Sequence, residues 1–161
     1  MIRRTWAPRG QTPVLRTKSS WRRASALGAI AYSKARAPRL RLHFTRRPFR
    51  KEDVLRFVKH LARHVRGRVV LVLDNLGAHK SRLLKAWLAE HRRIRVMYLP
   101  PYAPELNPVE GLWAWLKGTK LANVCDDDLH PLIARLRIAK RNLRRRPRLL
   151  HSFLAKAGLS L

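Results

Sequence analysis

The sequence predicts a mixed α/β domain, and three of its features support that prediction. A chain of 161 residues with 46% hydrophobic residues has the size of one ordinary domain and enough apolar side chains for a core. Residues 39–45 alternate between apolar and basic or polar side chains, which is typical of a half-buried strand. From residue 51 onward apolar side chains recur every three or four positions, and short apolar runs separate these helical stretches. Strands followed by alternating helices and strands are typical of mixed α/β domains.

The first part of the chain has the pattern of β structure. Residues 11–15 are predicted to form a strand, because they follow the turn signal Pro-Arg-Gly at residues 8–10. Residues 21–33 form a long, mostly apolar stretch rich in small side chains. In residues 39–45 the apolar side chains lie on one face and the basic side chains on the other, so one face of this strand is expected to be buried.

The next segments alternate between helix and strand. Residues 51–65 predict a helix with one apolar stripe, and Glu52 and Asp53 suit its first turn. Residues 68–74, R-V-V-L-V-L-D, predict a central strand that is buried on both faces. A helix is expected over residues 80–90 and a strand over residues 94–99, followed by a proline-rich loop at residues 100–104.

The C-terminal part of the chain is predicted to be helical. Asn107 is a favourable N-cap, Pro108 suits the first helical position, and Glu110 completes a pattern like a capping box. A long helix is predicted to begin near the acidic residues 126–128 and to end before Pro147, which a shorter helix follows as far as Gly158.

The charge balance points to a polyanionic partner. The chain has 37 Lys and Arg against 9 Asp and Glu, a formal net charge of +28, so nucleic acid is the expected partner and a membrane surface is the weaker alternative. The single cysteine, Cys125, excludes an internal disulfide and a cysteine zinc cluster. The longest strongly apolar run, residues 69–73, is too short to span a bilayer.

None of the nine acidic residues lies in the first 51 residues, and two of the nine stand out. Asp74 ends a predicted buried strand, which is where open α/β sheets place their ligands. The alternative is that Asp74 or Asn75 caps the turn that follows. Glu110 is fully explained by the capping box, but the start of a helix after a rigid loop would also aim its carboxylate well.

Two carboxylates on separate elements of a basic protein suggest a site for Mg²⁺ or Mn²⁺, which prefer oxygen ligands and share them with phosphate. Such a site is typical of phosphoryl transfer on nucleic acid, in which two ions activate the attacking oxygen and stabilise the leaving one. A third or fourth carboxylate is normally needed to hold both ions. The acids at residues 126–128 are better explained by capping or solvation. His79 would touch phosphate or assist proton transfer, or else be a packed or exposed polar residue.

The final long helix is predicted to carry a basic face opposite its apolar stripe. We expect part of this face, and the basic side of the strand at residues 39–45, to neutralise DNA phosphates, the alternative being a solvated surface. The candidate DNA contacts on the helix are Arg137, Lys140, Arg141 and Arg144. Lys80, next to His79, is a further candidate.

Two blocks of sequence resemble the catalytic domain of DDE transposases, in the bacterial insertion-sequence branch related to mariner elements. They are L-D-N-L-G-A-H-K-S at residues 73–81 and L-P-P-Y-A-P-E-L-N-P-V-E at residues 99–110, and R-T-W-A-P-R-G-Q-T-P at residues 4–13 is similar too. The resemblance implies an RNase H-like mixed sheet flanked by helices, and DNA strand cleavage and transfer with two divalent ions, Mg²⁺ or Mn²⁺. It places Asp74 at the second catalytic aspartate and Glu110 at the final glutamate. Asn75, His79 and Asn107 match neighbours of these residues in the motifs.

The chain departs from the family pattern at one point. In the family, the first catalytic aspartate lies on a strand that precedes the segment matched here by residues 4–6. The first residue here falls after that point, so the resemblance implies that residues 1–161 are a single partial domain without its first strand and without the family's helix-turn-helix region. A shortened gene, a split frame or a wrong start would each explain this. We expect a DNA-associated cytoplasmic protein that holds its divalent ions weakly, because the first catalytic aspartate is missing. It should bind DNA with strong salt dependence, cleave it weakly or not at all, and tend to associate through an unpaired sheet edge. The alternative is a non-catalytic basic nucleic-acid-binding protein.

Overall fold

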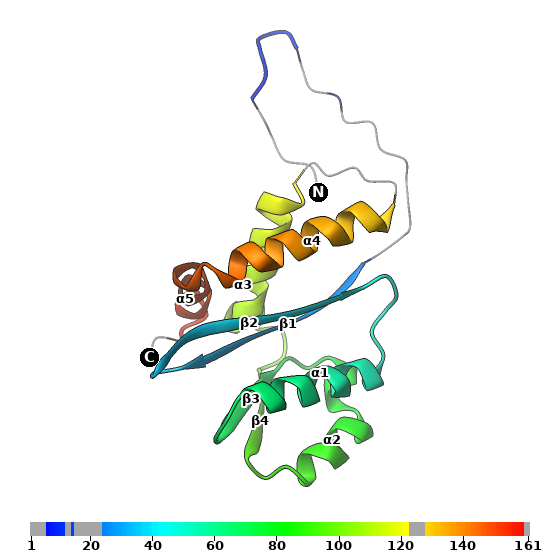
Figure 1. Ribbon diagram of the computed structural model, residues 1–161, viewed down its shortest axis with the longest axis vertical. Coiled ribbons are helices and arrows are strands. Elements are labelled where there is room, and N and C mark those ends of the chain that lie inside the picture. The colour runs from blue at the N-terminus through cyan, green and yellow to red at the C-terminus, as the bar shows by residue number, and fades with distance from the viewer. Residues whose placement is uncertain (1–5, 12–13, 15–23, 123–127, 160–161) are drawn as a thin grey trace.

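The computed structural model describes residues 6–11, 14, 24–122 and 128–159. Two pairs of strands form its sheets (Figure 1). Strands β1 (Ser25–Ser33) and β2 (Arg36–Thr45) pair antiparallel, whereas β3 (Val69–Leu73) and β4 (Ile94–Tyr98) pair parallel. The five α-helices of the described residues are α1 (Lys51–His64), α2 (Arg82–Ala89), α3 (Pro108–Trp115), α4 (Leu129–Arg144) and α5 (Pro147–Lys156). None of them is long and apolar enough to cross a membrane.

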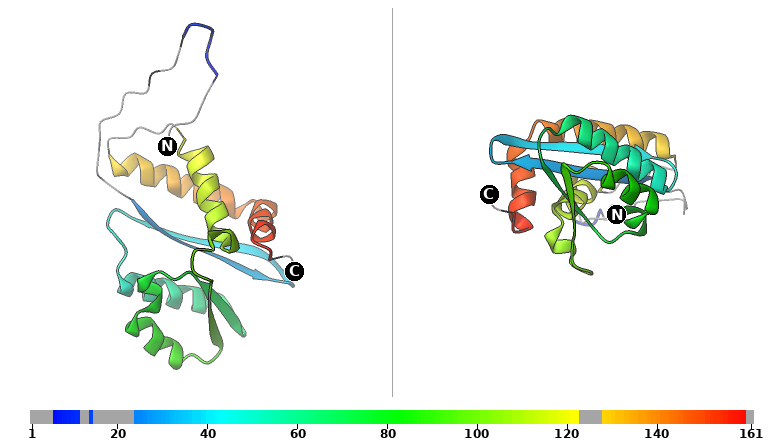
Figure 2. Two further views of the ribbon diagram at one scale, coloured as in Figure 1. Left: turned by 180° about the vertical axis from the view of Figure 1, so that it is seen from behind. Right: turned by 90° about the horizontal axis from the view of Figure 1, so that it is seen from below.

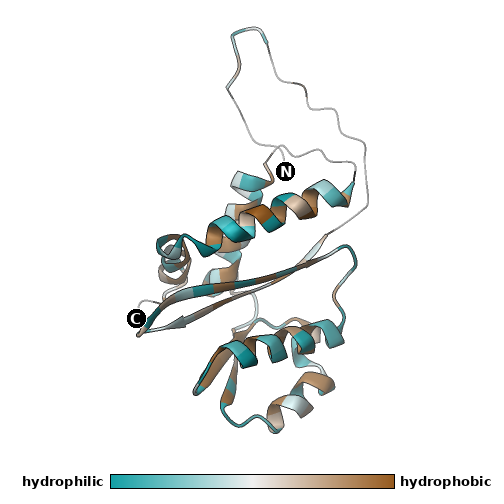
Figure 3. Cartoon of the chain, viewed as in Figure 1, coloured by the Kyte–Doolittle hydropathy of each residue, from teal (hydrophilic) through white to brown (hydrophobic). Residues whose placement is uncertain are grey.

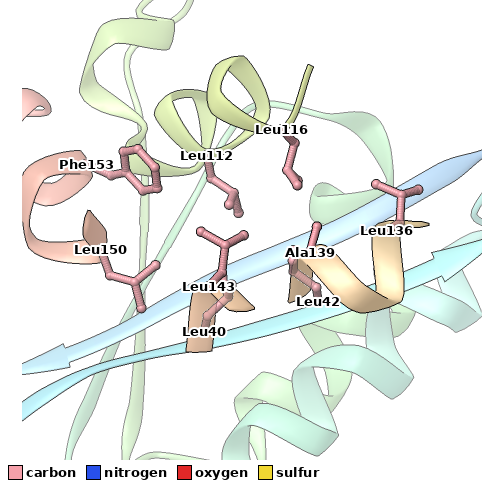
Figure 4. Packing of buried hydrophobic residues seen from close by; sticks show 9 residues of the cluster. All are labelled: Leu40, Leu42, Leu112, Leu116, Leu136, Ala139, Leu143, Leu150 and Phe153. Carbon is pink, nitrogen blue, oxygen red and sulfur yellow. The ribbon is translucent and has the colours of Figure 1, made fainter. Parts of the chain in front are cut away.

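The main core lies between the β1–β2 pair and the three C-terminal helices. Leu40 and Leu42 of β2 are buried, as the alternating pattern of residues 39–45 predicts. They pack against buried side chains of α3, α4 and α5, among them Leu112, Leu143 and Leu150 (Figure 4). Figure 2 shows that the chain leaving β4 runs up to α3, and α3 packs against β1 while α4 and α5 pack against β2. This core therefore fixes the position of α3, the helix that carries Glu110.

A second, smaller core joins the remaining helices to the parallel pair of strands. Val54 and Val58 of α1, Leu73 of β3 and Leu84 of α2 are buried there together. Figure 3 shows hydrophobic and hydrophilic residues interspersed along α1, as a helix with one buried stripe requires. The guanidinium of Arg93 donates to the carbonyl oxygens of Ala62 and Val65 at the end of α1, which the helix leaves without partners, and to the Gly67 carbonyl just after it.

The prediction that residues 68–74 form a strand buried on both faces is wrong in one respect. Leu71 and Leu73 face α1 and α2, but Val70 is 57% exposed and Val72 is 47% exposed. Among the described strands β3 pairs only with β4, and the helices that pack on this pair cover one face of it. A continuous apolar run does not distinguish a strand covered on one face from one covered on both.

The mixed α/β class with flanking helices is confirmed, but the single mixed sheet is not found among the described strands. The strands form two separate pairs, so each of the four strands has one edge with no described strand beside it. The predicted strand at residues 11–15 lies largely outside the described residues. The turn before it is present, because the Gln11 N–H donates to the Pro8 carbonyl at 3.0 Å.

Gly28 marks a close approach between β1 and α3. A Cβ atom at this position would lie 2.9 Å from a ring carbon of Trp113, closer than van der Waals contact allows. We expect Gly28→Ala to lower the free energy of unfolding by about 1–3 kcal/mol, the usual cost of overpacking, in a urea titration. The matched control is Gly77→Ala, since a Cβ on Gly77 meets no atom within 4 Å. Equal midpoints for the two variants would contradict the expectation.

Candidate active site

Asp74 lies directly after the C-terminal end of β3, and its side chain is 48% exposed. Its Oδ1 atom accepts a hydrogen bond from the Leu76 N–H at 3.1 Å and another from the His79 ring at 2.6 Å. The first of these bonds is the turn-capping role that the sequence left open. Both bonds fall on one carboxylate oxygen, so Oδ2 has no described partner and is available to a ligand. The capping role and a ligand-binding role are thus compatible.

His79 is held against Asp74 by its own surroundings. Its side chain is only 14% exposed, and it lies on the 3₁₀ turn Gly77–Lys80 between β3 and α2. The His79 carbonyl accepts a hydrogen bond from the Tyr98 hydroxyl at 3.1 Å, which ties the turn to the end of β4. Because Nδ1 is the ring atom that faces the carboxylate, the neutral ring donates from Nδ1 and leaves Nε2 as an acceptor. Lys80 lies beside it, with its ammonium 5.5 Å from the centre of the Tyr98 ring.

Asn75 links the loop after β3 to the end of β4. Its side-chain amide donates to the Leu99 carbonyl at 2.6 Å, and the Leu99 N–H donates to the Leu73 carbonyl at 2.9 Å. The proline-rich loop that leads to α3 therefore starts beside the loop that carries Asp74. Asn75 has a structural role here, which its position in the sequence did not specify.

The structure contradicts the capping-box explanation of Glu110. Asn107 is the N-cap of α3, and its Oδ1 accepts from the Val109 N–H at 3.1 Å, as predicted. In a capping box the Glu110 carboxylate would accept from the Asn107 N–H. That N–H instead donates to the Pro104 carbonyl at 3.0 Å, because the turn Pro104–Leu106 precedes the helix. Glu110 is exposed in the first turn of α3, and its carboxylate has no described hydrogen-bond partner.

The donor chemistry of each of these two carboxylates suits a hard divalent cation. Asp74 Oδ2 and the Glu110 carboxylate are oxygen donors with no described partners, on elements that follow the carboxyl ends of β3 and β4. Within the described residues no three His, Cys, Asp or Glu side chains lie close enough together to hold a metal ion. Of the acids at residues 126–128, only Asp128 is described; it occupies the N-cap position of α4, where its side chain accepts no capping hydrogen bond.

Two of the four predicted basic residues of α4 reach the backbone of β2. Lys140 Nζ donates to the Leu42 carbonyl at 2.6 Å, and Arg144 Nε donates to the Leu40 carbonyl at 3.4 Å. Arg137 and Arg141 are exposed on the same helix. The alternation of residues 39–45 predicted the basic face of β2, but not that α4 would place its cations at the edge of that strand.

Comparisons with known proteins give a matching family model and two similar sequences. The family model described as "DDE superfamily endonuclease" matches residues 1–129. Over 69 residues the chain is 38% identical to an uncharacterized 39 kDa protein of insertion element IS630 from Shigella sonnei, covering 43% of this chain and 20% of that protein. Over 57 residues it is 40% identical to the uncharacterized protein y4pE/y4sA of Sinorhizobium fredii, covering 35% of this chain and 39% of that protein.

A solved structure supports the fold. The chain in the crystal structure of the Mos1 strand transfer complex superposes with a TM-score of 0.58 at 17% sequence identity, covering 100% of this chain and 51% of that one. The expected RNase H-like arrangement is thereby confirmed at the level of the fold. The match spans well under two thirds of each of these three proteins.

Proposed function

This chain belongs to the DDE superfamily endonucleases, and from that membership we propose that it is catalytic-domain sequence of a DNA transposase of the insertion-sequence type. The proposed activity is metal-dependent cleavage and transfer of DNA strands. The observation that carries the proposal is the state of the two carboxylates. Asp74 accepts both of its described hydrogen bonds through Oδ1, which leaves Oδ2 available to a ligand. The Glu110 carboxylate accepts no hydrogen bond from the N-cap residue of α3.

Each residue of the site has a proposed part in that reaction. Asp74 and Glu110 are the proposed ligands of Mg²⁺ or Mn²⁺, and two such ions in a complete site would activate the attacking oxygen and stabilise the leaving one. His79 holds Asp74 in one orientation, as partners of metal ligands commonly do. Asn75 and Asn107 fix the loop and the helix that carry the carboxylates. Lys80, with the basic face of α4 that includes Arg137, Lys140, Arg141 and Arg144, is the proposed source of phosphate contacts.

A calorimetric titration with Mn²⁺ tests the metal site. We expect the chain to bind the ion saturably, and Asp74→Asn or Glu110→Gln to weaken binding by at least about 100-fold, because each removes a ligand. His79→Ala should weaken it by about 10–100-fold, the usual effect of losing a residue that orients a ligand. The matched control is Glu90→Gln, which removes an exposed carboxylate at the end of α2 and should change nothing.

Two results would count against the proposal. Unchanged saturable binding of Mn²⁺ by the Asp74→Asn variant would show that Asp74 is not a ligand of the ion. No binding by the unaltered chain would favour the alternative, a non-catalytic nucleic-acid-binding protein. Because Asp74 and Glu110 supply two carboxylates where a pair of ions normally needs a third, we expect the 161-residue chain to nick plasmid DNA weakly or not at all. Strong Mg²⁺-dependent nicking that is lost in Asp74→Ala would contradict that expectation.

A further inference from the structure

Helix α1 places two imidazole rings one helical turn apart on its exposed surface. His60 and His64 are both exposed, and residues four positions apart on a helix are neighbours on the same face. Their ring centres lie 4.2 Å apart, and the ring planes are inclined by 42°. Neither residue lies in the sequence blocks that carry Asp74 and Glu110, so the proposed DNA chemistry gives this pair no role.

A backbone hydrogen bond determines which nitrogen of His64 is free. Its Nδ1–H donates to the carbonyl oxygen of His60 at 2.7 Å. Because a carbonyl oxygen can only accept, Nδ1 carries the proton and the lone pair of Nε2 is left for another partner. Histidines that bind metal ions are commonly oriented in this way, with one ring nitrogen donating to a backbone carbonyl while the other coordinates the ion.

The distance between the two rings suits two imidazoles on one metal ion. Bonds from an imidazole nitrogen to Zn²⁺ are about 2.0–2.1 Å long, so two rings bound at a right angle have their centres roughly 4.5 Å apart. The observed 4.2 Å is close to that separation, so both rings are within reach of a shared ion. Two histidines four residues apart on one helix face also supply the zinc ligands of the H-E-x-x-H motif.

The charges around the pair select the kind of ion. The pKa of His60 is lowered by burial first and by positive charges after it, which keeps the ring neutral and able to coordinate. The groups that supply these charges are His64, Arg41, Arg63 and Lys140. Such surroundings do not attract a hard ion such as Mg²⁺, which relies on oxygen ligands. Imidazole nitrogen suits transition-metal ions, and their affinity for such sites rises through Ni²⁺ to Cu²⁺.

We propose that His60 and His64 together bind one divalent transition-metal ion, of the class of Cu²⁺, Ni²⁺ and Zn²⁺. Among the described residues, no three His, Cys, Asp or Glu side chains gather in one place, so the pair supplies two ligands and leaves the other positions to solvent. The site uses nitrogen donors on α1 and does not depend on the proposed function. An ion held by both rings links successive turns of α1 only when the helix is formed, so binding should stabilise the folded chain.

The test titrates Cu²⁺ into the 161-residue chain, prepared without a polyhistidine tag. Excess Mg²⁺ is present to compete for carboxylate sites, and Cys125 is changed to Ser in every sample because a thiol would also bind the ion. The variants are His60→Ala, His64→Ala and the double variant. Alanine is the best helix former, so these changes retain α1.

The matched control is His91→Ala. The Nδ1 atom of His91 lies 2.7 Å from the carbonyl oxygen of Trp87, four residues earlier, so this ring is held in the same way as that of His64. It stacks on the Trp87 ring, with the ring centres 3.8 Å apart, in place of a second imidazole. The control therefore removes an imidazole of the same orientation that has no partner for chelation.

We expect one Cu²⁺ ion to bind at the pair, with two nitrogen ligands counted in its electron paramagnetic resonance spectrum. Either single variant should weaken this binding by roughly 100-fold, because the second ring otherwise meets an ion that is already held close to it. The double variant should lose little more than either single variant, since both rings hold the same ion. His91→Ala should keep the unaltered affinity. Cu²⁺ should raise the urea midpoint of the unaltered chain but not that of His64→Ala.

Three results would overturn the inference. One is an equal loss of affinity in His64→Ala and His91→Ala. Another is a loss in the double variant that equals the two single losses added together, because the rings would then bind separate ions. The third is a spectrum with a single nitrogen ligand. None of these results affects the proposed function, which is tested by Mn²⁺ binding at Asp74 and Glu110.

Discussion

Raising the salt concentration from 50 to 200 mM is expected to weaken the binding of duplex DNA to the 161-residue chain by roughly 10³–10⁵-fold, the range for proteins that make 6–10 phosphate contacts. The physical reason is counterion release. A chain with 37 cations, 9 anions and a net charge of +28 neutralises many phosphates when it binds, and each contact returns condensed ions to solution. The measurement is an anisotropy titration at five or more salt concentrations, plotted as log affinity against log salt.

Two comparisons make this result specific. Duplexes of unrelated sequence should give the same slope, because phosphate contacts do not depend on sequence. Replacing chloride with another monovalent anion should leave the slope nearly unchanged, because the slope counts the cations that the phosphates release. A slope shallower than about two would mean that few cations meet phosphate. The charge of the chain would then reflect a solvated surface, which is the alternative that the sequence left open.

The secondary structure was predictable because each element depends on local patterns. The spacing of three and four residues over 51–65 predicted α1, and the alternation over 39–45 predicted β2 with Leu40 and Leu42 inward. What failed were properties that depend on neighbours distant in sequence. Residues 68–74 contain the same apolar run whether one face of the strand is covered or both, so the exposure of Val70 and Val72 could not be predicted.

The candidate site shows the same division. The positions of Asp74 and Glu110, at the end of a strand and the start of a helix, follow from the sequence. The hydrogen bond from His79 to Asp74 spans five residues and depends on the 3₁₀ turn between them, which the sequence did not predict. Glu110 forms no capping box because the Asn107 N–H donates to the Pro104 carbonyl and not to the Glu110 carboxylate. The capping-box pattern was present in the sequence, but only the fold decides whether the Asn107 N–H donates to the Glu110 carboxylate or to the Pro104 carbonyl.

Leu112→Ala is expected to lower the free energy of unfolding by about 2–5 kcal/mol, the range for removing a fully buried leucine side chain. Leu112 is 0% exposed and lies on α3, two residues after Glu110. It packs in the main core with Leu40 and Leu42 of β2 and with side chains of α4 and α5. Truncation leaves a cavity where four elements meet, and the surrounding side chains can relax only partly. Urea denaturation followed by circular dichroism gives the difference in stability.

Two further variants separate the loss of packing from the loss of an apolar side chain. Leu112→Met keeps most of the volume and should cost less than about 1.5 kcal/mol. Leu106→Ala removes the same atoms from a side chain that is 39% exposed, just before α3, and should cost much less than Leu112→Ala. Similar losses for the two alanine variants would mean that α3 is not anchored through Leu112. The position of Glu110 would then have to depend on the Asn107 cap, because its own carboxylate makes no described hydrogen bond.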